Sequence, residues 1–192
     1  ATAETAPANP RALLNAGEQL ARAGQTAEAA ARFAAALQLQ PNYITARFDL
    51  GLALLELRRP AEAAEHLATA LRLNPDHAGV AFNLGRACLQ LGRTTEAAEA
   101  FARAVRLAPE QPSAHFQLAH TLIELGRLPE AISHFGTAVR LAPTAADYRF
   151  NHATALLQAG RKAEAIAEYE AVLRLNPGDA EAARNLAIAR AR

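Results

Sequence analysis

Six histidines and one cysteine are the side chains of this 192-residue sequence best suited to metal or nucleophilic chemistry. No two histidines form a His-x-x-x-His pair, and none joins the cysteine at the spacing of a zinc site. We therefore expect neither a metal nor a cofactor. The histidines are His66, His77, His115, His120, His134 and His152.

The cysteine, Cys88, belongs to an apolar stripe that also contains Ala81, Leu84 and Gly85. This i, i+3, i+4, i+7 spacing predicts one buried face of a helix. A thiol buried among apolar groups is a poor nucleophile. The sequence also lacks a glycine-rich phosphate loop, and the segments between its predicted helices are too short to build an active site. We expect no catalytic residue and no enzymatic activity.

Two adjacent columns of residues, repeated every 34 positions, favour the binding of a polypeptide instead. A carboxamide donates and accepts hydrogen bonds at once, which suits it to the main chain of an extended peptide. Two alternatives stay open, because the rings could be partly buried and the amides could bond to their own backbone. The aromatic column is Phe48, Phe82, Phe116 and Phe150; the polar column is Asp49, Asn83, Gln117, Asn151 and Asn185; Arg86 and His120 follow three residues later in two repeats.

The elements that position these residues are set by a 34-residue repeat. An alanine stands twelve residues before each repeated proline, and a bulky residue stands eight before it. Glycines end the first helix of four units, whereas Arg58 takes that place in the second unit and we expect Pro60 to stop the helix there. The prolines are Pro41, Pro75, Pro109, Pro143 and Pro177; the alanines are Ala29, Ala63, Ala97, Ala131 and Ala165; the bulky residues are Phe33, Leu67, Phe101, Phe135 and Tyr169; the glycines are Gly24, Gly92, Gly126 and Gly160.

The stretch from Phe82 to Pro109 carries nearly the whole pattern of the tetratricopeptide repeat family, which residues 10–179 resemble. The family's first large aromatic is missing, so we expect weaker aromatic packing there. The resemblance implies an all-α fold, a right-handed superhelical α-solenoid of antiparallel helix hairpins. It also implies that partners bind in a concave groove lined by the first helix of each hairpin. The place of the aromatic is taken by Leu13, Arg47, Ala81, His115 and Arg149.

The repeat predicts one domain between two terminal segments. We expect residues 1–9 to be a flexible leader and residues 180–192 to be a capping helix, because Arg190 stands where an apolar side chain belongs. His115 and His152 fall on core stripes, whereas His66 and His134 lie on second helices and are expected to be exposed. The five units are predicted at 10–43, 44–77, 78–111, 112–145 and 146–179.

Composition narrows the partner and the compartment. A net charge of +1 argues against nucleic acid, which needs a basic stripe. No apolar run approaches the ~20 residues of a membrane span, so direct membrane insertion is not expected. Arginine makes up all but one of the basic residues, which suggests a GC-rich bacterial genome. We favour the cytoplasm, with the periplasm as the alternative.

The sequence thus predicts a protein–protein interaction scaffold or adaptor that binds a partner protein or a peptide in its concave groove. The peptide could be extended or form an amphipathic helix. One alternative is the substrate-recruiting region of a larger enzyme, for example a glycosyltransferase. Another is self-assembly into a homo-oligomer through the apolar face of the first helix, which carries Leu13, Ala16 and Leu20.

Overall fold

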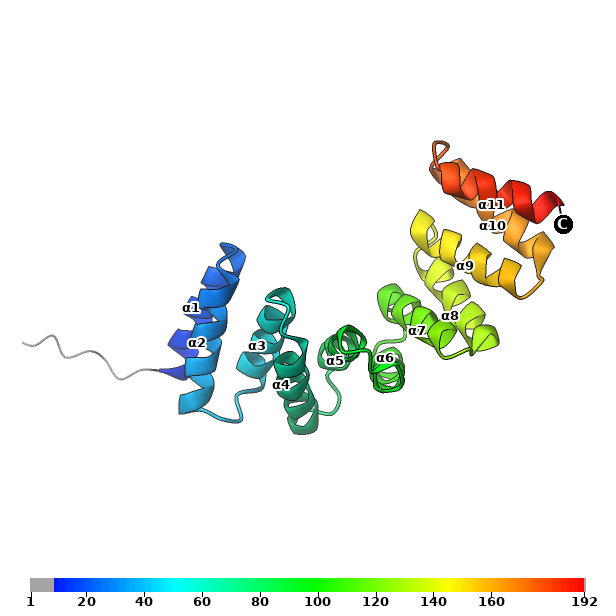
Figure 1. Ribbon diagram of the computed structural model, residues 1–192. Helices are drawn as coiled ribbons and strands as arrows, with labels where there is room; N and C mark the ends of the chain where they lie inside the picture. Colours follow the sequence, from blue (N-terminus) through cyan, green and yellow to red (C-terminus); the bar gives the residue numbers. More distant parts are fainter. Residues whose placement is uncertain (1–8, 192) are drawn as a thin grey trace, which may run out of the picture. The chain divides into compact units, whose positions relative to one another are not determined.

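The computed structural model describes residues 9–191, and every regular element in this range is an α-helix (Figure 1). Residues 1–8 of the predicted leader lie outside the described residues. The helices are α1 (Pro10–Arg22), α2 (Thr26–Leu39), α3 (Ile44–Glu56), α4 (Pro60–Leu73), α5 (Ala78–Gln90), α6 (Thr94–Leu107), α7 (Pro112–Glu124), α8 (Leu128–Leu141), α9 (Ala146–Gln158), α10 (Lys162–Leu175) and α11 (Ala180–Ala191).

The chain divides into two compact units, the first ending at Leu107 and the second beginning at Ala108. Unit 1 contains the hairpins α1/α2, α3/α4 and α5/α6. Unit 2 contains α7/α8, α9/α10 and α11. Within each unit a second helix packs both on its hairpin partner and on the first helix that follows it. The predicted all-α class of stacked helix hairpins is confirmed; the division into five repeats of one domain stays a prediction.

Each hairpin closes on a bulky side chain of its second helix. Phe101 of α6 is fully buried and lies against Gly85 of α5, where an added Cβ would meet the ring at 2.7 Å. Gly17 and Gly51 meet Phe33 and Leu67 in the same way. The repeated alanines of the second helices are completely buried at Ala29, Ala63, Ala97, Ala131 and Ala165. Small residues therefore sit where the helices approach most closely, as the repeat predicts.

The turn inside each hairpin needs one residue in the left-handed conformation. Gly92 supplies it after α5 with φ 70°, and glycines do the same in three other hairpins. Arg58 has φ 59° in the second hairpin, the one positive φ of a non-glycine residue among the described residues. The prediction that Pro60 stops α3 is wrong. Pro60 is the first residue of α4, a position where its missing N–H costs nothing.

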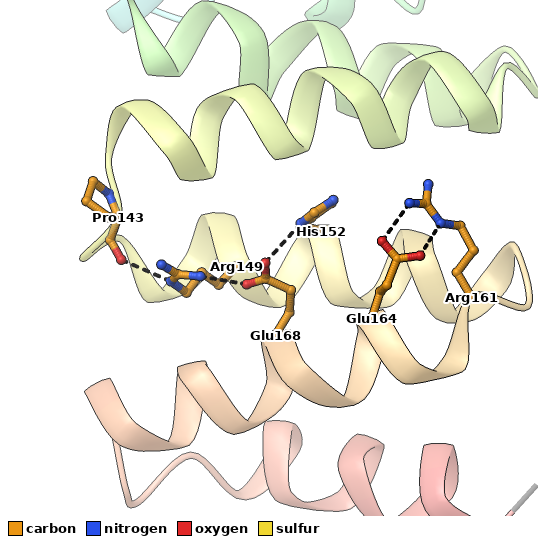
Figure 2. A network of polar contacts seen from close by, with 6 residues as sticks. All are labelled: Pro143, Arg149, His152, Arg161, Glu164 and Glu168. Atoms are coloured by element: carbon orange, nitrogen blue, oxygen red, sulfur yellow. Dashed lines mark hydrogen bonds and ion pairs between the residues drawn. The ribbon is translucent and has the colours of Figure 1, made fainter.

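Polar side chains replace the missing aromatic of the repeat. Arg149 of α9 donates from Nε to the carbonyl of Pro143 at 2.9 Å and from a terminal nitrogen to Glu168 of α10 at 2.7 Å (Figure 2). We call this arrangement a polar bracket, because one side chain ties the loop before a hairpin to the hairpin's second helix. His152 Nδ1 lies 3.6 Å from Glu168, too far for a hydrogen bond. His152 and Arg149 together lower the pKa of Glu168.

The same bracket recurs with other residues in two earlier hairpins. Arg47 donates to the Pro41 carbonyl at 2.9 Å and lies 3.4 Å from His66 Nδ1. His115 Nε2 lies 3.0 Å from the Pro109 carbonyl, and its Nδ1 lies 3.0 Å from His134 Nδ1.

These contacts make His66 and His134 half-buried, so the expectation that both are exposed is wrong. Burial lowers the pKa of each ring, and the neighbouring Arg47 or His115 adds to that effect.

Arg58→Gly should stabilise the protein, because glycine adopts positive φ without the steric cost that arginine carries. The greater freedom of glycine in the unfolded chain offsets part of the gain. We expect the free energy of unfolding to rise by about 0.5–1 kcal/mol in urea titrations. The matched control, Gly92→Ala, should lower it by a similar amount. A destabilised Arg58→Gly variant would show that the arginine makes a stabilising contact.

Glu168→Gln should destabilise the protein by about 1–3 kcal/mol near neutral pH, because Arg149 would keep its charge in a half-buried place without a counter-charge. Glu168 and Arg149 side chains are each 21% exposed. The control is Glu164→Gln, which breaks the exposed Arg161–Glu164 pair of the same hairpin (Figure 2). That pair should contribute less than about 0.5 kcal/mol. Since the pKa of Glu168 is depressed, the parent's advantage should be present above the ordinary glutamate pKa and disappear as pH falls through the folded one.

Candidate functional site

The residues predicted to bind a partner lie on the first helices of the hairpins and on α11. In unit 1 the helices α1 and α3 contact each other, as do α3 and α5, so their side chains share one face. The predicted residues are Phe48 and Asp49 on α3, Phe82, Asn83 and Arg86 on α5, Phe116, Gln117 and His120 on α7, Phe150 and Asn151 on α9, and Asn185 on α11.

The four phenylalanines of the aromatic column are half-buried rather than fully displayed. Phe82 packs edge-on against Phe101 with ring centroids 5.5 Å apart, and Phe150 packs on Tyr169 at 5.7 Å. Phe48 instead contacts the His77 ring at 5.2 Å. Phe82 and Phe150 therefore pack within their own hairpins, whereas Phe48 contacts the N-cap residue of α5 in the next hairpin.

The side chains of the polar column differ in how many hydrogen bonds they make within the protein. Asn83 is 8% exposed; it donates to the Gly79 carbonyl at 2.8 Å and accepts a hydrogen bond from Arg86 at 2.9 Å. Asn151 donates to the Asp147 carbonyl at 2.8 Å but keeps its carbonyl oxygen and one N–H unused. The side chain of Gln117 makes no hydrogen bond within residues 9–191.

An aromatic cluster surrounds Phe116 in unit 2. Tyr148 of α9 stacks on Phe116 with centroids 4.5 Å apart, and His120 packs edge-on against the same ring at 4.6 Å. Burial lowers the pKa of His120, which favours the neutral ring. The repeat did not predict Tyr148, because the equivalent places of the preceding hairpins hold only aliphatic side chains. The one sign of it in the sequence is that Tyr148 is aromatic where the preceding repeats have small aliphatic residues.

A pocket of about 250 Å³ opens between α1 and α3 of unit 1. Buried Phe33 and Ala53 contribute apolar surface, together with half-buried Leu52. Asp49 lines this pocket and has no hydrogen bond or ion pair within the described part of the chain. Burial, together with the nearby Glu18 carboxylate, raises the pKa of Asp49 to about 6. The full lining is Glu18, Ala21, Arg22, Thr26, Phe33, Asp49, Leu52, Ala53 and Glu56.

A larger hollow of about 410 Å³ lies elsewhere in unit 1, between α4 and α6. Cys88 contributes to its lining but is 3% exposed, and burial raises the pKa of its thiol. Such a thiol is a weak nucleophile. Residues 9–191 contain no group of His, Cys, Asp and Glu side chains that could hold a metal ion. No helix in that range is both long and apolar enough to cross a membrane.

Asp49→Asn should raise the free energy of unfolding by about 1 kcal/mol near pH 7. A pKa raised from 3.8 to about 6 means that the folded state binds the proton more tightly, so ionisation opposes folding above pH 6. The full shift corresponds to about 3 kcal/mol, but solvent screens a half-exposed carboxylate. The gain should shrink as pH falls below 6 and vanish below about 4. Paired urea titrations across this range measure it, and a pH-independent difference would contradict the assignment.

Comparison with known proteins agrees with this architecture. One tetratricopeptide repeat model matches residues 48–112, 116–180 and 150–192, and a second tetratricopeptide repeat model matches residues 20–70. No curated protein matches the chain.

Three solved structures illustrate the likeness. MamA from Desulfovibrio magneticus RS-1 is 19% identical, with 89% of this chain and 97% of that chain covered and a TM-score of 0.82. YrrB, described as a TPR protein with an unusual peptide-binding site, is 23% identical over 90% and 89% of the two chains, with a TM-score of 0.80. TTC0263 from Thermus thermophilus is 25% identical over 95% and 100%, with a TM-score of 0.63. With family models matching most of its length, the chain belongs to the tetratricopeptide repeat family.

Proposed function

We propose that this protein is an interaction scaffold that binds an extended segment of a partner polypeptide along the first helices of its hairpins. Tetratricopeptide repeat proteins are generally non-enzymatic scaffolds, and membership of this family supports the proposal. YrrB, a structural neighbour, is described as having a peptide-binding site.

The observation that carries the proposal is unused hydrogen-bonding capacity beside half-buried aromatic rings. On α7, the free carboxamide of Gln117 directly follows Phe116, whose ring is held by Tyr148 and His120. On α9, Asn151 directly follows Phe150 and retains an acceptor and a donor. An amide beside a fixed ring presents both polar and apolar contact, which is what a peptide main chain and its side chains need.

Rigidity of the surface supports the same function. Phe116 and Phe150 are fixed by packing within their hairpins, and the Asn151 amide is oriented by its bond to the Asp147 carbonyl. A partner segment therefore meets side chains that are already ordered, which reduces the conformational entropy lost on binding. Asn83 and Arg86 satisfy each other within α5, so we assign them a smaller part.

The test begins with peptides selected from a random library against the purified chain. We expect a selected peptide to perturb amide resonances of first helices, α7 and α9 among them, and to spare α8 and α10. Replacing both Gln117 and Asn151 by alanine should weaken binding by about tenfold, since two hydrogen bonds contribute about 0.5–1.5 kcal/mol each. The dissociation constant comes from calorimetry.

The matched control is Ser133→Ala, an exposed polar side chain on α8 in the same unit. This variant should bind like the parent. Resonance changes confined to second helices, or equal affinity of the double variant and the parent, would reject the first-helix surface as the binding site. Failure to select any binding peptide would reject peptide binding altogether.

A further inference from the structure

The pocket between α1 and α3 has a charge distribution that its own residues do not balance. Three carboxylates line it, from Glu18 on α1 and from Asp49 and Glu56 on α3. Arg22 is the one cation in the lining, its side chain is 76% exposed, and its contact with Glu18 is 3.4 Å long. The pocket therefore carries an excess of two negative charges.

The three carboxylates differ in how well they are satisfied. Glu18 has its pair with Arg22, and Glu56 accepts a hydrogen bond from the Thr26 hydroxyl at 3.1 Å. Asp49 is half-buried beside Leu52 and Ala53 and has neither a hydrogen bond nor an ion pair within residues 9–191. Burial of a carboxylate without a partner is unfavourable, and an incoming cation removes that cost.

Apart from Arg22 and Thr26, the rest of the lining is apolar. It consists of Ala21, Phe33, Leu52 and Ala53. Lysine and arginine combine an apolar stem with a charged end, and they commonly lay the stem along apolar surface while the charge reaches a polar rim. The volume of about 250 Å³ is below the roughly 300–1,000 Å³ of pockets that enclose drug-sized ligands. It suits one side chain rather than a whole small molecule.

We propose that the pocket between α1 and α3 takes a basic side chain, arginine or lysine, of the bound polypeptide, with Asp49 as its main counter-charge. The inference rests on the proposed function, because Asp49 lies on α3, one of the first helices to which that function assigns partner binding. It adds the chemistry of the partner: a segment that carries a basic residue where it crosses the second hairpin. Glu18 and Glu56 reinforce the attraction from either side.

The hollow between α4 and α6 does not offer the same complementarity. Its rim mixes Glu65, Glu96 and Glu99 with Arg93 and Arg103. Arg103 is engaged by the Pro75 carbonyl at 2.7 Å, and Arg93 lies 3.9 Å from Glu96. Glu65 and Glu99 are exposed rather than half-buried, so solvent screens their charges and the hollow has no buried carboxylate comparable to Asp49.

A coupling measurement tests the inference. Peptides are selected from a random phage-displayed library against the whole chain, and the best one is resynthesised with its basic residue replaced by norleucine. Each peptide is titrated into the parent and into Asp49→Asn, which keeps the side-chain shape and removes the charge. We expect the basic peptide to bind Asp49→Asn about tenfold more weakly than the parent, and the norleucine peptide to bind both equally.

Glu99→Gln on α6 is the control, since it removes an exposed negative charge of unit 1 away from the pocket. It should leave the affinity of both peptides nearly unchanged. Equal helicity and equal or higher thermal stability of Asp49→Asn exclude loss of folding as the cause of weaker binding.

Each other outcome has a distinct meaning. Selected peptides without a basic residue, or a basic residue whose contribution is unchanged in Asp49→Asn, would overturn the basic-side-chain pocket and leave peptide binding intact. Self-association of the parent that is abolished by Asp49→Asn would also overturn it, because the occupant would then be a second copy. A library that yields no binding peptide would overturn both this inference and the proposed function.

Discussion

The close contact between a small residue on one helix and a bulky residue on the next is the interaction on which the rest of the structure depends. Gly85 and Phe101 show it most clearly, since even a methyl group at residue 85 would overlap the ring. Packing this tight fixes how the two helices of a hairpin lie against each other. The first helix is then held against its neighbouring helices, and the part of its surface that they do not cover is left to solvent. Surface chemistry in this protein is therefore a consequence of core geometry.

The missing aromatic of the repeat shows how one structural task is done with different chemistry. An aromatic side chain would fill this place by apolar packing between the two helices. Arg149 and His115 instead link a proline carbonyl to the second helix by hydrogen bonds. In the third hairpin, where Ala81 offers no polar group, Arg103 of α6 binds the Pro75 carbonyl instead. A carbonyl that would otherwise lack a donor is satisfied in each case. The pKa values of His134 and Glu168 are both lowered in the folded protein, so we expect its stability to change with pH, which an aromatic side chain in the same place would not cause.

The 34-residue repeat predicted the features that are set by backbone packing, and it missed the contacts that depend on two particular side chains. The helices, the buried alanines and the glycine turns follow from spacing, because each position has the same neighbours in every repeat. His134 illustrates the limit: a second-helix position is exposed by pattern, yet His115 nineteen residues earlier draws it inward. Asn83 is a second case. The sequence left open that amides of the polar column bond to their own backbone, but the pattern did not show which of them would do so, and Asn83 is bonded to both Gly79 and Arg86. Tyr148 was missed because it breaks its column rather than continuing it.

The candidate site combines these two levels. Repetition supplies similar first helices, and the proposed selectivity of the site comes from departures from the repeat. Asp49 is the one ionised side chain in a column otherwise made of carboxamides, and the third hairpin's equivalent, Asn83, is satisfied internally. Asn83 and Asn151 each donate to the backbone carbonyl four residues earlier. A carboxylate cannot donate that bond, so Asp49 is left with unused acceptors in a partly apolar pocket. Asp49 has a carboxylate where the other repeats have a carboxamide. This one difference gives the position a negative charge without an internal partner, which favours a cation from outside the chain.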